Sequence, residues 1–191
     1  MSLILKAHIE KLLGMELPFY DTIEKYFVPA ALRKKENLLT EGKICKANYF
    51  VVAGCLRMFF VNEKGVEQTT QFGLEHWWLA DYSSFSLQRP SEFFIQAVEP
   101  SQVLCLSHSA QEELLLEYPR LERYFRLVHQ RAHAASQFRI KVLYGNSREE
   151  LYHGFVRLYP DFVQRVPQYL LASYLGITPE YLSELRARRL S

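Results

Sequence analysis

The segment from Gln168 to Ala187 constrains the fold of this chain more than any other. Its apolar residues occupy the positions that a pair of crossing helices must bury: Leu171, Ala172, Leu175, Ile177, Leu182 and Leu185. Gly176 lies where the tight turn between the helices requires a positive φ. Thr178 is suited to cap the second helix, and Pro179 to occupy its first position. The segment therefore predicts a helix-turn-helix.

The second helix of this motif would present one face to DNA. At 100° per residue, that face lies opposite Leu182 and Leu185. The residues expected to contact DNA lie on this face, on its flanks and at the starts of the two helices: Gln168, Thr178, Pro179, Glu180, Tyr181, Ser183, Glu184, Arg186, Ala187, Arg188 and Arg189. Glutamate repels phosphate but accepts a hydrogen bond from cytosine N4. Glu180 and Glu184 therefore predict base reading through acceptors, while the arginines hold phosphates.

Before this segment, the spacing of apolar residues changes from that of helices to that of strands, and then returns to that of helices. Apolar residues at helical spacing precede Gly14, and a second helical segment begins near Pro18. Turn residues then divide a series of short aromatic and β-branched runs, at 49–52, 56–61, 68–72, 93–98 and 103–106. Short strands that follow one another at roughly 8–12 residues predict an antiparallel sandwich or roll.

Helical periodicity returns after the last of these runs. Ser109 to Glu112 has the form of a capping box and predicts a helix start. Pro119 fits the first turn of a longer helix that ends near Gly145. A second capping box, Ser147 to Glu150, opens a further amphipathic helix that runs to about Tyr159.

The long helix carries one apolar stripe, in which residues recur in threes and fours: Leu121, Phe125, Val128, Ala132, Ala135, Phe138 and Val142. Two interpretations are open. The stripe packs on the chain's own β domain, or it pairs with the same helix of a second copy. We favour the dimer, because the stripe continues past what a small roll can cover.

Composition excludes several classes of protein. With 23 basic and 21 acidic residues, the formal charge of +2 gives no long-range field toward DNA or membrane, so a local patch must meet any such partner. The longest apolar run, Tyr49 to Ala53, is far too short to cross a bilayer, and the first residues lack a signal-peptide layout. We expect a cytoplasmic protein without a membrane partner.

The sequence predicts neither an enzyme nor a metal site. Cys45, Cys55 and Cys105 form no C-x-x-C pair and are expected to be reduced core residues. His129 and His133 lie at i, i+4, a spacing compatible with ligation, but we favour hydrogen bonding for both. No nucleophile comes with an orienting base in a recognisable motif.

The order of roll, long helix and helix-turn-helix resembles the Crp/Fnr family of bacterial transcription regulators over nearly the whole chain. Five stretches look like landmarks of that family: 39–42, 49–51, 54–57, 165–169 and 174–180, which read LTEG, YFV, GCLR, RVPQY and YLGITPE. These stretches look closest to a short form of the family. We also expect no β-hairpin wing after the second helix of the motif, because few residues follow it.

The resemblance implies an α+β fold. A cyclic-nucleotide-binding-like antiparallel β-roll (a double-stranded β-helix or jelly roll) with flanking helices is expected at 1–118, a dimerisation helix at 119–145 and a helical DNA-binding domain at 146–191. It also implies double-stranded DNA and a second copy of the chain as partners, together with RNA polymerase and an unidentified small-molecule effector. The effector pocket is expected at Asp81, Tyr82, Ser83, Arg89, Ser91, His133 and Gln137.

Two departures from the family matter. Members that bind cyclic nucleotide have a Gly-Glu pair for the ribose and an arginine for the phosphate. Here Asp81 is the nearest acid, the arginine position falls on Ser91, and Glu92 follows it. A carboxylate opposes an anion, so cyclic nucleotide as a cofactor is disfavoured. At the DNA end, Glu184 replaces a common arginine. The alternative function is a ligand- or protein-binding module whose helix-turn-helix no longer reads DNA.

Overall fold

The computed structural model describes residues 2–190 and the side chains of residues 3–188. Contacts divide the chain into two compact units. The first unit holds Met1–Phe60 and Gln71–Gln130, and the second holds Val61–Thr70 and Arg131–Ser191. The terminal residues 1 and 191, which bound the first and last expected domains, lie outside the described part. The three-part division at 118 and 145 stays a prediction, since the contacts divide the long helix between two units.

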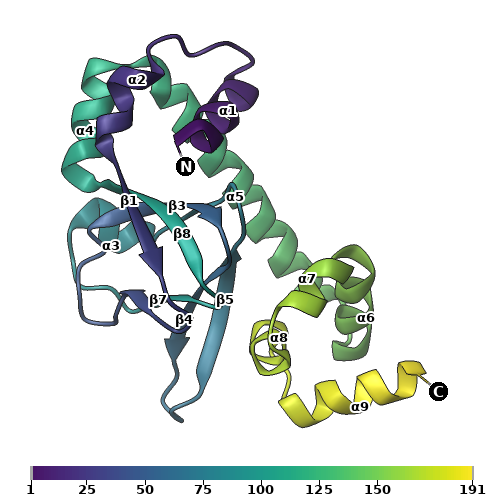
Figure 1. Cartoon of the computed structure of the whole chain (residues 1–191). Helices are drawn as coiled ribbons and strands as arrows, with labels where there is room; N and C mark the ends of the chain where they lie inside the picture. The colour runs from purple at the N-terminus through teal and green to yellow at the C-terminus, as the bar shows by residue number, and fades with distance from the viewer. Residues whose placement is uncertain (1, 191) are drawn as a thin grey trace. The chain divides into compact units, whose positions relative to one another are not determined.

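The strands of the chain form two antiparallel sheets (Figure 1). The strands are β1 (Phe27–Leu32), β2 (Asn37–Leu39), β3 (Ala47–Ala53), β4 (Leu56–Val61), β5 (Glu67–Gly73), β6 (Trp78–Leu79), β7 (Phe94–Ala97) and β8 (Ser101–Ser107). One sheet has the order β1-β8-β3-β6 and the other β2-β7-β4-β5. The predicted α+β fold with an antiparallel roll is confirmed.

The sequence missed three strands for identifiable reasons. β1 contains Pro29, which lowers strand propensity but is tolerated because β1 lies at a sheet edge. β2 and β6 have three and two residues, too few for a periodicity to be read. The five runs that the sequence did predict correspond to β3, β4, β5, β7 and β8.

In sequence, helices come before, within and after the series of strands. Two of them precede the strands, α1 (Ser2–Leu13) and α2 (Tyr20–Ile23), with a short 3-10 turn at Glu24–Tyr26. A short helix, α3 (Tyr82–Leu87), interrupts the strand series, and α4 (His108–Glu117) follows it. The predicted start of α4 at Ser109 is wrong by two residues. Ser107, the last residue of β8, is the N-cap, and its hydroxyl accepts from the Ala110 amide at 3.1 Å.

Successive side chains of β3 enter two different apolar clusters of the first unit, because strand residues alternate in direction. Tyr49 and Val51 join residues of both sheets, including Leu56 and Ile95. Phe50 joins the second cluster, which packs the other face of its sheet on helices. Its members include Leu5, Ile9, Leu13, Trp78, Leu104, Leu106, Leu114, Leu121, Tyr124 and Phe125.

Tyr124 is the polar centre of this second cluster. Its hydroxyl accepts from the Trp78 indole Nε1 at 2.7 Å and lies 2.8 Å from His8 Nδ1. Burial raises the pKa of Tyr124, so the phenol stays protonated. The phenol thus links the first helix, the sheet and the long helix through one oxygen.

The long helix α5 (Arg120–Gly145) changes environment along its length. Leu121 and Phe125 are buried in the core of the first unit and Val128 packs against it, so these positions of the expected dimer stripe are already filled. Val142 packs against the core of the second unit. The exposed part of the stripe is therefore shorter than the sequence suggested, because the N-terminal end of the long helix packs on the chain's own β domain.

The second unit is built around four helices that follow α5. They are α6 (Arg148–Leu158), α7 (Pro160–Arg165), α8 (Gln168–Leu175) and α9 (Pro179–Leu190). Their shared core contains Leu151, Tyr152, Val156, Val163, Leu171, Ala172, Leu175, Ile177, Leu182 and Leu185. Among the described residues, no helix combines the length and apolar character that crossing a membrane requires.

Tyr124→Phe tests the polar centre of the first unit. We expect the free energy of unfolding of this unit to fall by about 1–3 kcal/mol, because the indole N–H of Trp78 loses its buried acceptor. Denaturant unfolding followed by tryptophan fluorescence measures this, since Trp77 and Trp78 both lie in the first unit.

Tyr144→Phe is the matched control, because Tyr144 is 89% exposed. Its effect should lie within about 0.5 kcal/mol of zero. Equal stability of the Tyr124→Phe variant and the parent protein would contradict the role of this hydroxyl.

Candidate functional site

The helices α8 and α9 form the helix-turn-helix that the sequence predicted. Gly176 adopts a left-handed conformation with φ of 68°, as the turn requires. The Ile177 amide donates to the Ala172 carbonyl at 3.1 Å and closes the end of α8. Thr178 Oγ1 accepts from the Tyr181 amide at 3.2 Å, which caps α9. The turn glycine and the cap are therefore confirmed.

The outward face of α9 carries the expected polar residues. Leu182 and Leu185 are fully buried, while Glu180, Ser183, Glu184 and Ala187 are exposed. These exposed positions lie on the side of α9 away from its apolar contacts, which is the geometry of a helix available to a partner. Two of these four exposed positions are acidic, as the sequence indicated.

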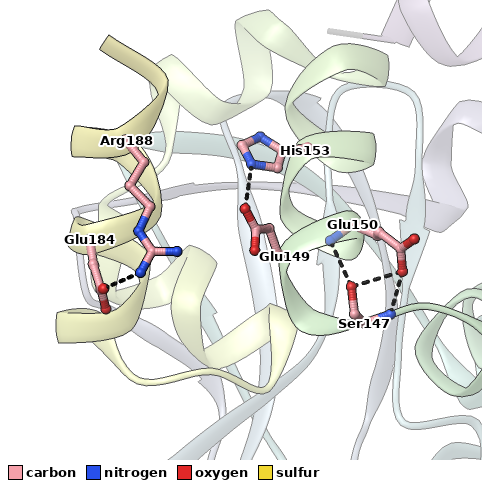
Figure 2. A network of polar contacts seen from close by, with 6 residues as sticks. All are labelled: Ser147, Glu149, Glu150, His153, Glu184 and Arg188. Carbon is pink, nitrogen blue, oxygen red and sulfur yellow. Dashed lines mark hydrogen bonds and ion pairs between the residues drawn. The ribbon is translucent and has the colours of Figure 1, made fainter. Parts of the chain in front are cut away.

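One acid on this face is paired within the helix. Arg188 Nη2 lies 2.6 Å from Glu184 Oε1, one turn away (Figure 2). Both side chains are more than half exposed, so the pair contributes little to stability and can exchange for another partner. The local charge at this turn is therefore close to zero, which lowers the repulsion that Glu184 alone would exert on phosphate.

The other residues expected to contact DNA have varied environments. Arg186 is exposed, and Tyr181 packs partly against the core of the second unit. The Gln168 side-chain amide donates to the Val163 carbonyl at 3.4 Å. Arg189 belongs to α9, but its side chain lies outside the described part. Their role in DNA contact stays a prediction.

The start of α6 adds polar groups to the same unit (Figure 2). Ser147 and Glu150 form the predicted capping box, in which Ser147 Oγ accepts from the Glu150 amide and Glu150 Oε2 accepts from the Ser147 amide. Hydrogen bonds from Ser147 lower the pKa of Glu150. Glu149 lies 3.7 Å from His153 on the same helix. The sequence did not single out Glu149 or His153.

The expected effector pocket holds an internal hydrogen bond between its two key positions. Ser91 Oγ donates to Asp81 Oδ2 at 2.7 Å. Asp81 Oδ1 also accepts from the amides of Ser83 and Ser84, which makes it the N-cap of α3. Asp81 and Ser91 are only 8% and 3% exposed. The acid and the hydroxyl thus satisfy each other in the place where ribose and phosphate groups are expected.

The position at which the family resemblance expects a phosphate-binding arginine holds a serine here. A cyclic phosphate needs donors or a cation at the arginine position. Ser91 there has one hydroxyl proton, which it gives to Asp81, while its oxygen accepts from the Phe93 amide at 3.0 Å. A buried carboxylate beside this point would also repel the phosphate.

Three of the remaining expected pocket residues are exposed. Arg89 is exposed, and its carbonyl accepts from the Ser84 hydroxyl. His133 and Gln137 are exposed on the part of α5 that belongs to the second unit.

Tyr82 packs beside His129, one of the two histidines that the sequence analysis noted. Its ring meets His129 of α5 edge-on, with centroids 4.7 Å apart. Burial raises the pKa of Tyr82 to about 12 and lowers the pKa of His129. Within the described residues, no group of three or more histidine, cysteine or acidic side chains is placed to hold a metal ion.

Comparison with known proteins finds a family that is similar to the roll. Residues 29–118 match the cyclic nucleotide-binding domain family. No curated protein matches the chain in sequence.

Several solved structures share the fold. FixK2 from Bradyrhizobium japonicum has a TM-score of 0.70 at 16% identity, covering 85% of this chain and 83% of its own. A CooA mutant from Carboxydothermus hydrogenoformans has a TM-score of 0.68 at 19% identity, covering 94% and 83%. A protein from Eubacterium rectale, described as a transcriptional regulator of the Crp/Fnr family, has a TM-score of 0.72 at 14% identity, covering 91% and 87%. Residues 29–118 are therefore similar to the cyclic nucleotide-binding domain family, and the chain shares the fold of these three solved structures.

Proposed function

We propose that this chain is a homodimeric DNA-binding regulator of transcription of the Crp/Fnr type, and not an enzyme. The observation that carries the proposal is the helix-turn-helix. Its core is closed by Leu182 and Leu185, and α9 presents its polar face to solvent. A buried inner face with an exposed polar outer face is what a recognition helix needs in order to enter a major groove.

DNA binding by this face depends on few cations. Arg186 and Arg188 lie on the last turns of α9, near the acidic outward face. We infer that Arg188 leaves Glu184 for a phosphate when DNA binds, which frees the carboxylate to accept from cytosine N4. Few phosphate contacts per subunit imply weak binding by one copy, and two copies on paired half-sites about 34 Å apart would compensate.

The dimer surface is assigned to the second half of α5. Phe138 is 57% exposed, and Ala135 is exposed three residues before it. Ala132 is half-buried on the same stripe. Small residues around one large exposed aromatic side chain allow two helices to approach closely. The filled positions Leu121 and Phe125 take no part in this surface.

The β-roll is the sensing part in this proposal. The hydrogen bond between Asp81 and Ser91 supports a signal other than an ordinary cyclic nucleotide. A small molecule of different chemistry or a protein contact would act there and shift a population of α5 conformations that sets the spacing of the two α9 helices. Contact with RNA polymerase belongs to the same proposal.

The second candidate function is a binding module that has lost DNA recognition. The acidity of the outward face of α9, at Glu180 and Glu184, favours it. Such a module would bind a basic partner protein through α9 and show no attraction to duplex DNA.

Gly176→Val directly tests DNA binding by the helix-turn-helix. The φ of 68° is strained for a β-branched residue, so the turn should shift and misplace α9. Titration of labelled random duplex DNA at low salt, followed by anisotropy, should show salt-dependent binding by the parent protein and at least a tenfold loss in the variant.

Gly154→Ala is the control, because a Cβ at Gly154 meets no atom within 4 Å and alanine suits the helix interior. Full DNA affinity in a folded Gly176→Val variant would refute the proposal that the helix-turn-helix binds DNA. Absence of any salt-dependent binding by the parent protein would favour the binding-module alternative.

Phe138→Glu tests the dimer surface. A charge at the centre of an apolar helix pair is costly to bury, so sedimentation at micromolar concentration should change from dimer to monomer. Tyr144→Glu is the control, because residue 144 lies about 120° around the helix from residue 138. A parent protein that sediments as a monomer would contradict the proposal.

The pocket predicts no response to ordinary cyclic nucleotides. Cyclic AMP or cyclic GMP at about 1 mM should raise the Tm by less than about 1 °C, because binding requires breaking the hydrogen bond between Asp81 and Ser91 without a cation in return. Adenosine 5′-monophosphate serves as the control for unspecific nucleotide effects. A rise of several degrees with a cyclic nucleotide alone would overturn this prediction.

A further inference from the structure

The tip of the hairpin between β4 and β5 belongs to the same compact unit as the helix-turn-helix. This tip, residues Val61–Thr70, is grouped with Arg131–Ser191. β5 is the last strand of its sheet in the order β2-β7-β4-β5. One side of an edge strand presents backbone N–H and C=O groups that no neighbouring strand pairs. Those groups need partners from elsewhere.

Ser173 of α8 supplies partners for two of these groups. Its Oγ accepts from the Thr69 amide at 2.9 Å and donates to the Glu67 carbonyl at 2.8 Å. Thr69 Oγ1 lies 3.2 Å from the same oxygen. The Glu67 carbonyl and the Thr69 amide are two residues apart on one strand, so a single hydroxyl takes the place that a further strand would occupy.

Arg139 makes a second contact to the same tip. Its guanidinium donates to the Thr70 carbonyl through Nη1, and Nη2 donates to the Tyr174 carbonyl at 2.9 Å and lies 3.4 Å from the Thr69 carbonyl. The guanidinium also lies over the Tyr174 ring, 3.8 Å from its centroid. Planar, multidentate contacts of this kind are specific to arginine. Arg139 thus joins α5, α8 and β5 at one point.

These contacts are separate from the core that holds the helix-turn-helix together. The core residues of α8 are Leu171, Ala172 and Leu175, and Ser173 is not among them. The contacts also leave Glu180 and Glu184 exposed. They therefore fix where α8 lies relative to the strand without covering the face of α9.

We propose that Ser173 and Arg139 are positioning residues for DNA reading, which fasten α8 to the edge of β5 and so hold α9 in one orientation. The inference rests on the proposed function. β5 crosses the boundary between the two units at Thr70 and Gln71, so Ser173 contacts a strand whose backbone continues into the first unit. Preorganisation by this contact reduces the conformational entropy that DNA binding must otherwise remove.

The first test measures the contact without DNA. Amide exchange at Thr69, resolved by NMR, should accelerate about tenfold in Ser173→Ala, which removes the hydroxyl acceptor. Ser173→Thr keeps the hydroxyl and should retain protection. Ser136→Ala, an exposed serine on α5, is the matched control and should not change it. Unchanged exchange at Thr69 in Ser173→Ala would refute the contact.

The second test measures the consequence for reading. Ser173→Ala should lower affinity for duplex DNA by at least about fivefold, while exchange at Leu182 and the far-UV circular dichroism remain as in the parent protein. Ser173→Thr should restore affinity, which a general loss of stability would not explain. Arg139→Lys keeps the charge but loses the planar contacts, and should resemble Ser173→Ala.

Two further outcomes would overturn the proposal. Faster Thr69 exchange with unchanged DNA affinity would make the contact purely structural. Higher affinity for duplex DNA in Ser173→Ala would mean that the contact holds α9 in an orientation that hinders DNA binding. Failure of the parent protein to bind any duplex would remove the proposed function itself, and exchange at Thr69 would still establish whether the contact forms.

Discussion

The structure depends on one helix, α5, which contributes apolar side chains to two separate cores. The first turns of α5 bury Leu121 and Phe125 under the sheet, and Tyr124 bonds there to Trp78. Near its other end, Val142 packs on the core of the helix-turn-helix. Each core alone is modest in size, and small cores are marginal. The shared helix therefore serves the stability of each unit as well as their covalent connection.

The sequence predicted what depends on neighbours along the chain. The turn at Gly176, the cap at Thr178 and the capping box of Ser147 and Glu150 are set by residues within a few positions of one another, and all three are present. The five well-patterned strands were also found, because alternation is a local property. β1 was not predicted because it contains Pro29, and a proline within a run argues against a strand unless that strand is known to lie at a sheet edge.

Contacts between distant residues could not be predicted in this way. Ser173 and Thr69 are 104 positions apart, and nothing in either stretch signals the other. Asp81 and Ser91 were chosen separately as pocket residues, but their mutual hydrogen bond requires the helix and the loop to be placed in space. The dimer stripe failed at Leu121 and Phe125 for the same reason: periodicity shows that a face is apolar but not what covers it.

The hydroxyl of Ser173 has a consequence for the behaviour of the protein in concentrated solution. An unpaired edge strand is a template on which a strand of another molecule can add, and natural proteins blunt such edges with charges, bulges or covering segments. Here a helix side chain takes up the Glu67 carbonyl and the Thr69 amide. The Ser173 hydroxyl thus occupies a position on this edge at which a strand of a second molecule would otherwise pair, so one side chain both positions α8 and covers this stretch of the edge.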